Sequence, residues 1–272
     1  MKKAYNITEL CNVFDLPSSS YYYRSVDTTK KEAIVIAKIK EISIGFNYTY
    51  GKRRINKSLI DDGFNIGVYK TKTLMGIAGI KVIIPKKKPY YADSCVSHKY
   101  VGNLLNREFN PTAPNTSWVG DITYMPTSQG FYYLATVMDL HSRKIIGYSM
   151  SQSANAELTK MALDNAIRLT NATTNNLMFH SDQGCQYSAN EFRSKLKLHN
   201  ITQSMSRKGN CWDNAVQERF YRSLKSEHLN HLTLRNHADA GIQVEQYIQF
   251  YNYKRRHSAI GYLTPHQKYS AV

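Results

Sequence analysis

The chain has 272 residues, of which 42% are hydrophobic, and a formal net charge of +16. This hydrophobic content can build a packed core, which argues against global disorder. No apolar run of about 18 residues occurs, no apolar signal-peptide core follows the N-terminus, and the four cysteines are scattered without a Cys-x-x-Cys pair. We therefore expect a cytoplasmic protein without a membrane partner, and the basic excess favours a partner with a phosphate backbone.

Residues 1–84 have the pattern of a small, all-α, helix-turn-helix-like DNA-binding region. Residues 7–24 predict two short helices around a proline-containing turn. Apolar residues at helical spacing predict a helix over 30–42. A basic helix is predicted over 50–60, and a further helix over 68–76.

Basic side chains of these last two helices are candidate DNA contacts. Lys52, Arg53 and Arg54 open the first helix, where they can reach phosphates. The second helix carries Lys70 and Lys72, and lysine cannot form the bidentate contact with guanine that arginine forms. This favours backbone contact over base reading. The alternative is a structural helical domain with a basic face.

The remaining sequence divides into a basic linker, residues 85–114, and an α/β region, residues 115–272. Prolines and a lysine run predict the linker. Three strands are then predicted over 118–125, 131–139 and 144–150, and the short turns between them predict an antiparallel meander.

The second half of this region alternates helices and strands. Helix 156–169 is followed by strand 176–179, by a helix that reaches about residue 199, by strand 201–205 and by helix 214–228, with a C-terminal helical tail beyond. Ser188 and Glu191 have the spacing of a capping box for the second of these helices. The order β-β-β-α-β-α-β-α predicts a mixed five-stranded sheet with helices, which is the ribonuclease-H-like order.

Three carboxylates occupy positions suited to a site. Asp121 lies within an apolar strand, where a carboxylate needs a cation or hydrogen-bond donors. Asp182 follows a strand and precedes Gly184, as loop residues of functional sites often do. Glu218 lies on the late helix. Each acid alone is more often a cap or a surface charge, but on these elements the three can converge at one edge of the sheet.

The sequence around these acids resembles a known family. Asp182 and Glu218 are separated by 35 residues. The most specific strings are His180-Ser181-Asp182-Gln183-Gly184, the run from Ser206 to Glu218, and Tyr251-Asn252-Tyr253-Lys254-Arg255-Arg256-His257 with Gly261-Tyr262-Leu263-Thr264-Pro265. In this order they resemble transposases of the retroviral-integrase superfamily, and within it the second open reading frame product of insertion-sequence family three.

The resemblance implies a DDE transposase that cuts DNA at the ends of an insertion sequence and joins the freed ends to a target. It implies that Asp121, Asp182 and Glu218 hold two Mg²⁺ ions, for which Mn²⁺ can substitute. The implied partners are insertion-sequence ends, target duplex, further copies of the chain on DNA, and an upstream reading-frame product that recognises the ends. The implied location is the bacterial cytoplasm, at the nucleoid.

Further residues are predicted to support this site. His180 either protonates a leaving group or braces Asp182, while Asp139 caps a turn. Asn210, Asp213 and Asn214 are predicted to form a loop and helix N-cap that aim Glu218. The predicted DNA contacts of this half are Arg207, Lys208, Arg222, Lys225, Arg255 and Arg256, and Trp118 and Trp212 also suit DNA contact.

Two alternatives remain. A catalytically inactive DNA-binding inhibitor of transposition would share the basic charge, although the three intact acids argue against it. A tyrosine recombinase would use Arg255, Arg256, His257 and Tyr269, although the earlier arginine that it requires is not apparent.

Overall fold

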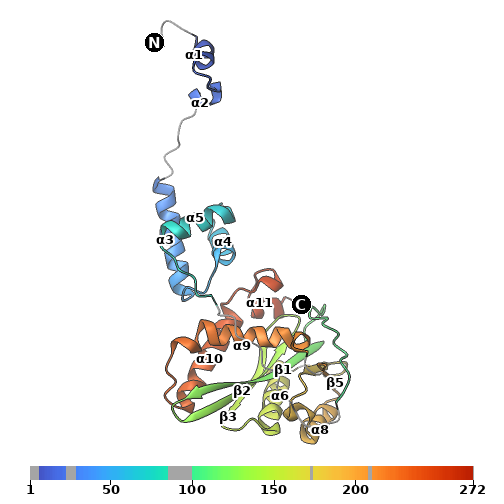
Figure 1. The fold of residues 1–272 in the computed structure, drawn as a ribbon. Helices are drawn as coiled ribbons and strands as arrows, with labels where there is room; N and C mark the ends of the chain where they lie inside the picture. The colour runs from blue at the N-terminus through green and yellow to red at the C-terminus, as the bar shows by residue number, and fades with distance from the viewer. Residues whose placement is uncertain (1–5, 23–28, 85–99, 172–173, 208–209, 272) are drawn as a thin grey trace.

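The computed structural model describes residues 6–22, 29–84, 100–171, 174–207 and 210–271. A helical region comes first and a sheet domain follows, and the helical region lies on the side of the sheet domain that carries α9, α10 and α11 (Figure 1). Among the described residues, no helix is long and apolar enough to cross a membrane.

The helical region contains the helices expected from the sequence. The first two are α1 (Ile7–Val13) and α2 (Ser18–Tyr22), which pack on each other. The next three are α3 (Thr29–Gly45), α4 (Lys52–Asp61) and α5 (Val68–Ile77), and they share a core built from Ile39, Ile55, Leu59 and Leu74. The buried Asn56 amide ties α4 to α5, because it donates to the Ile66 carbonyl at 2.7 Å and to the Thr71 hydroxyl at 3.0 Å.

The sheet has the five strands and the mixed topology that the sequence predicts. They are β1 (Ser117–Thr127), β2 (Gly130–Asp139), β3 (Ile145–Ser151), β4 (Met178–Ser181) and β5 (Thr202–Met205), in the spatial order β3-β2-β1-β4-β5. The first three form the expected antiparallel meander, and β4 and β5 continue the sheet in parallel with β1.

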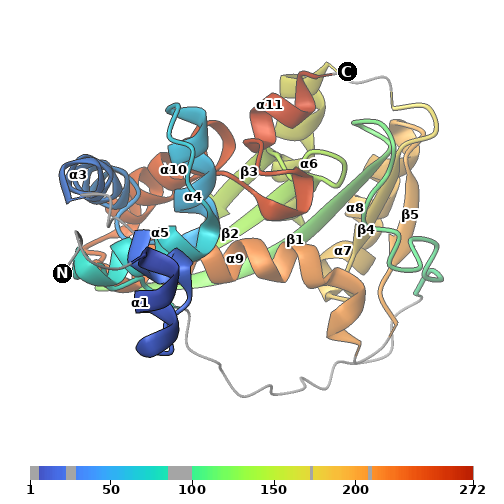
Figure 2. The same ribbon diagram turned by 90° about the horizontal axis from the view of Figure 1, so that it is seen from above.

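Helices cover both faces of this sheet (Figure 2). One face is covered by α6 (Ala156–Thr170), α7 (Cys185–Ser188) and α8 (Asn190–Leu198), the other by α9 (Ala215–Glu227) and α10 (His237–Tyr253). Shorter helical turns are η1 (Cys211–Asn214), η2 (Leu229–His231), η3 (Ser258–Ile260) and α11 (Pro265–Tyr269). The predicted capping box is wrong: Ala189 is the N-cap of α8, and the Ser188 hydroxyl donates within α7 to the Cys185 carbonyl.

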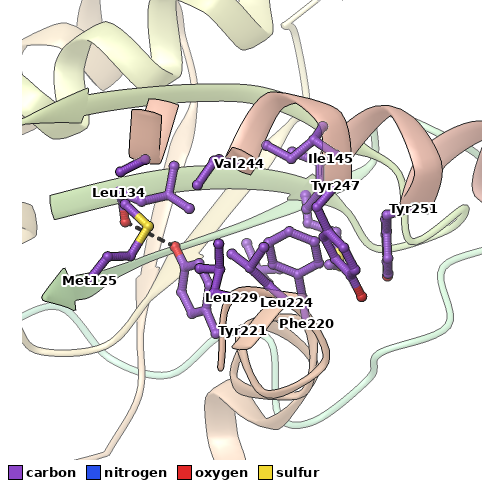
Figure 3. Packing of buried hydrophobic residues seen from close by; sticks show 14 of the residues in the cluster. Met125, Leu134, Ile145, Phe220, Tyr221, Leu224, Leu229, Val244, Tyr247 and Tyr251 are labelled. Carbon is purple, nitrogen blue, oxygen red and sulfur yellow. Dashed lines mark hydrogen bonds between the residues drawn. The ribbon is translucent and has the colours of Figure 1, made fainter. Parts of the chain in front are cut away.

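The two cores follow from the alternation of side chains along a strand. Trp118 faces the α6–α8 layer and the next residue, Val119, faces the α9–α10 layer. Figure 3 shows the latter core, which contains Leu134 of the sheet, Phe220 of α9 and Tyr247 of α10. Trp118 is therefore a core residue and does not contact DNA.

Part of the predicted linker belongs to the sheet domain. Leu105 is only 1% exposed and lies in the core beneath α9 and α10. The backbone amides of Leu104 and Leu105 donate to the Ser204 hydroxyl of β5 at 2.9 and 3.2 Å. Residues 100–114 thus pack on the sheet rather than forming a solvated spacer, and residues 85–99 lie outside the described part of the chain.

Candidate active site

Asp121 and Asp182 lie at corresponding positions of neighbouring parallel strands. Val119 of β1 pairs with His180 of β4. Each acid comes two residues after its member of this pair, so the two carboxylates leave the sheet side by side at one edge. The Asp182 carboxylate accepts a hydrogen bond from the Gly184 amide at 3.0 Å, which orients it.

Glu218 lies on the exposed side of the first turn of α9, whose inner side is fastened to β1 and β2. The Tyr221 hydroxyl donates to the Asp121 carbonyl at 2.5 Å and lies 2.8 Å from the Thr136 hydroxyl. The Gln217 amide also donates to Thr136, which faces Asp121 in the β1–β2 register. These bonds set α9 at the level of Asp121.

Electrostatic interactions join the three acids. Burial raises the pKa of Asp121 well above its usual range, and the charges of Asp182 and Glu218 raise it further. The pKa of Glu218 is also raised, by desolvation and by the charge of Asp182. The positive charge of the Lys225 ammonium opposes this effect and lowers the pKa of Asp121. Its Nζ is 4.7 Å from the centre of the Tyr124 ring.

Close packing beneath Asp121 explains the glycine that precedes it. A Cβ atom at Gly120 would lie 2.4 Å from Cζ of Phe179. The Gly120 carbonyl also accepts a hydrogen bond from the Asn214 amide at 3.5 Å. Asn214 occupies the predicted N-cap position of α9, but its side chain makes no capping bond and instead contacts β1.

His180 has a structural environment. Its ring is fully buried, and Nδ1 and Nε2 lie 2.8 and 3.1 Å from the hydroxyls of Ser204 and Ser206. Burial lowers its pKa to about 4, so the ring is neutral at physiological pH. This environment favours the alternative in which His180 braces the strand ahead of Asp182.

Asp213 holds the loop in front of α9. Its buried carboxylate accepts from Nε of Arg107 at 2.7 Å, from the Asn103 amide at 2.9 Å, and from the backbone and Nε of Arg207 at 3.1 and 3.2 Å. Burial would raise the pKa of Asp213, but the bonds from Arg107 and Arg207 outweigh it and lower the pKa to about 2. Arg107 also donates to Asn210.

Arg107 and Asn103 are not among the site residues predicted from the sequence. Both lie in the predicted linker, and no local pattern marks a side chain whose partner is more than 100 positions away. Trp212, next to Asp213, is 69% exposed and is free to meet a large partner. The loop therefore presents an aromatic ring beside two guanidinium groups.

Three of the predicted DNA contacts lie where the helical region meets the sheet domain: Arg255 is buried, and Arg54 and Arg256 are half-buried. Arg255 is 4% exposed and forms an ion pair of 2.6 Å with Glu227. Arg256 pairs with Asp61 at 2.6 Å. Burial lowers the pKa of Arg54, and the nearby Arg255 charge lowers it further. Sequence alone cannot separate an interface arginine from a solvated one.

Other predicted DNA contacts remain on the surface. Arg53 and Arg207 are exposed, and Lys52 lies 5.6 Å from the centre of the Tyr69 ring. Arg222 lies on α9, one turn after Glu218. Lys208 lies outside the described residues.

The arrangement for a tyrosine recombinase is not present. The Tyr269 hydroxyl accepts from the Asn115 amide at 2.9 Å, while Arg255 is engaged with Glu227. Burial and the charges of neighbouring arginines, Arg255 first, together lower the pKa of His257 to about 3. A neutral His257 and a separately bonded Tyr269 do not form a phosphotransfer site.

The donor set suits a hard divalent cation. Among the described residues, no three His, Cys, Asp or Glu side chains are already gathered closely enough to hold a metal ion. The three carboxylates nevertheless supply only oxygen ligands, and their mutual repulsion adds to the effect of burial in raising the pKa of Asp121. A bound Mg²⁺ or similar cation would relieve that repulsion.

A mixed sheet with these acids on β1, after β4 and on α9 defines an integrase-type core. Residues 111–211 and 199–265 match family models described as integrase core domain, and residues 30–88 match one described as HTH-like domain. A solved intasome of simian T-cell lymphotropic virus, in complex with PP2A regulatory subunit B56 gamma, shares the fold with a TM-score of 0.52 and 14% identity. The matched region covers 86% of this chain and 74% of the intasome chain.

Curated relatives are closer in sequence. The transposase for insertion sequence element IS904 of Lactococcus lactis is 36% identical over 85% of this chain and 92% of its own length. Transposase InsF for insertion sequence IS3A of Escherichia coli is 38% identical over 80% of this chain and 76% of its own. The chain belongs to the insertion-sequence transposases with an integrase core, in insertion-sequence family three.

Proposed function

We propose that this chain is a DDE transposase, which cleaves DNA strands at the ends of an insertion sequence and transfers them to a target. The supporting observation is the placement of Asp121, Asp182 and Glu218 on β1, after β4 and on α9, where β1 and β4 are parallel neighbours and Tyr221 fastens α9 to Asp121. Membership of a transposase family argues for an active enzyme rather than a catalytically inactive inhibitor.

The three acids are the proposed ligands of two Mg²⁺ ions, with Mn²⁺ as a substitute. When bound, such ions supply Lewis acidity for an in-line displacement at phosphorus. Asp121, Asp182 and Glu218 would hold these ions, and the positive charge of the ions would attract the reacting phosphate. Tyr221 and Gln217 keep α9 at the level of Asp121.

Basic and aromatic side chains around the acids are the proposed DNA contacts. We propose that Lys225 and Arg222 on α9 and Arg207 on the loop neutralise the phosphates of a strand that crosses the site. Trp212 offers a face on which an unpaired base can stack. In the helical region, Lys52 and Arg53 are the proposed contacts to a duplex backbone.

The proposed organisation follows the sequence division into a helical DNA-binding region, a basic segment at 85–114 and a catalytic domain from 115. The described end of that segment packs with the catalytic domain. The enzyme is proposed to act as a homo-oligomer on DNA in the cytoplasm, at the nucleoid. An upstream reading-frame product is proposed to supply end recognition.

The test is replacement of each acid by its amide. Asp121→Asn, Asp182→Asn and Glu218→Gln should each lower strand transfer by at least about 10³-fold, roughly 4 kcal/mol in barrier. Binding to DNA should persist, because backbone affinity comes from lysine and arginine. Strand transfer is measured with a labelled end substrate in Mg²⁺.

Asp164→Asn is the matched control, because Asp164 forms a surface ion pair with Lys195 on the opposite face of the sheet. It should leave transfer unchanged. Near-normal transfer by any one of the three site variants would remove that acid from the assignment. Absence of metal-dependent nicking by the unmodified chain would favour the inhibitor.

A further inference from the structure

A tyrosine of the helical region is built into the segment that follows α10. Tyr50 is 1% exposed, and its hydroxyl lies between two backbone groups of that segment. It donates to the Lys254 carbonyl at 3.4 Å and accepts from the Arg256 amide at 2.8 Å. The Phe46 ring stacks on Tyr50 with centroids 3.9 Å apart. The hydroxyl thus fixes the backbone on both sides of Arg255.

Arg255 extends from this fixed backbone to the C-terminal end of α9. Its Nε and Nη2 donate to the two carboxylate oxygens of Glu227 at 2.8 and 2.6 Å. The Tyr247 hydroxyl donates to the same carboxylate at 2.9 Å. Glu227 is the last residue of α9, and Glu218 lies in its first turn.

This ion pair is sensitive to geometry because it is buried. Arg255 and Glu227 side chains are 5% and 9% exposed. Removing such charges from water is compensated only when every donor and acceptor is well placed. A shift of the backbone around Arg255 would therefore move or loosen the end of α9.

We propose that Arg255 is a positioning residue for α9, which it holds through Glu227. Because Tyr50 fixes the backbone around Arg255, this ion pair depends on the docking of the helix-turn-helix-like domain. Contacts then run without a break from the helical region to the helix that carries Glu218. The position of a DNA-binding domain is thereby transmitted to the active site. This inference rests on the proposed function for its catalytic consequence only.

The experiment compares Tyr50→Phe with Tyr48→Phe in the full chain. The first removes only the bridging hydroxyl, and the second makes the same change at a residue 40% exposed in the same region. In metal-free protein, Tyr50→Phe should speed amide hydrogen exchange in residues 219–228 at least about tenfold. It should also lower strand-transfer turnover at saturating DNA about tenfold, with the half-saturating DNA concentration unchanged. Tyr48→Phe should change neither quantity.

Unchanged exchange in α9 with Tyr50→Phe would overturn the proposal, as would a loss confined to DNA affinity. Arg255→Lys keeps the charge but loses the paired donors, so it should reproduce both effects more strongly. If that variant does not fold, Tyr50→Phe decides alone. If the unmodified chain joins no DNA, the proposed function fails, while faster exchange in Tyr50→Phe would still establish the link to α9.

Discussion

Asp121 and Asp213 show how environment decides the behaviour of one residue type. Asp121 has two acids as neighbours, and burial with their charges raises its pKa well above the usual range. Burial would also raise the pKa of Asp213, but the bonds from Arg107 and Arg207 outweigh this effect and lower the pKa to about 2. The first carboxylate is ready for a cation, while the second is a structural anchor.

These opposite shifts predict opposite effects on stability. A raised folded-state pKa means that the folded chain holds the Asp121 proton more tightly than the unfolded chain, so stability falls as pH rises above about 4. At pH 7, with a chelator present, Asp121→Asn should therefore have a higher melting temperature than the unmodified protein. The increase should be roughly 2–4 °C for each 1 kcal/mol gained in the free energy of unfolding. The gain should vanish near pH 4. Thermal melts across this range measure it.

Asp213→Asn is the opposing case. Because its folded pKa is lowered, the stability from Asp213 is present above about pH 4 and is lost as pH falls toward about 2. This variant should melt below the unmodified protein at pH 7. A lower melting temperature for Asp121→Asn at pH 7 would contradict the repulsion inferred among the three acids.

At the scale of elements, close approach between α6 and β3 sets the thickness of one layer. A Cβ atom at Gly147 would lie 2.5 Å from the Ala162 carbonyl oxygen and 2.5 Å from the Ala166 nitrogen. Both are backbone atoms of α6, so neither can swing aside. The helix can lie at this distance only because β3 carries glycine there.

Gly147→Ala should therefore destabilise the sheet domain. Overpacking of this kind costs about 1–3 kcal/mol. Gly102→Ala is the control, since a Cβ atom there meets nothing within 4 Å. Urea or thermal unfolding of both variants measures the difference. Equal stability of the two would mean that α6 moves outward freely.

At the scale of the whole molecule, the charge of +16 predicts steep salt dependence of DNA binding. Neutralising about 6–10 phosphates would cost about 10³–10⁵ in affinity between roughly 50 and 200 mM salt. The measurement is duplex binding at several salt concentrations. A shallow slope, equivalent to one or two contacts, would show that the basic surface serves a different partner.

We also expect that the isolated chain discriminates only weakly among DNA sequences. The candidate recognition helix α5 has no arginine or glutamine, and its Lys70 pairs with Glu32 at 2.5 Å. No stretch of the sequence sustains an apolar heptad pattern for a dimerising coiled coil. The isolated chain should bind terminal-repeat and random duplexes with similar affinity.

A competition assay with the purified chain measures this preference, and a fusion to the proposed upstream reading-frame product is the matched comparison. The fusion should prefer the ends. Preference of the isolated chain for terminal-repeat DNA above about a hundredfold, some 2.7 kcal/mol, would show that its helical region reads sequence unaided.

The sequence by itself determined the order of helices and strands and the family. Strand alternation, helical spacing and turn residues are local patterns, and each predicted strand of the sheet is present. Asp121 and Asp182 could be proposed together from their predicted strands and the family strings, and the structure adds that β1 and β4 are parallel neighbours. The family strings predicted Glu218 without any knowledge of packing.

Only the tertiary structure decided the roles of the arginines. In the sequence, Arg54, Arg255 and Arg256 are indistinguishable from solvated positive charges. In the structure, Arg255 is buried against Glu227, Arg256 pairs with Asp61 of α4, and Arg54 is half-buried. Arg107 became an anchor because it reaches Asp213, 106 positions away. A side chain's role depends on the partner that folding brings to it, and partners so distant in sequence leave no local pattern.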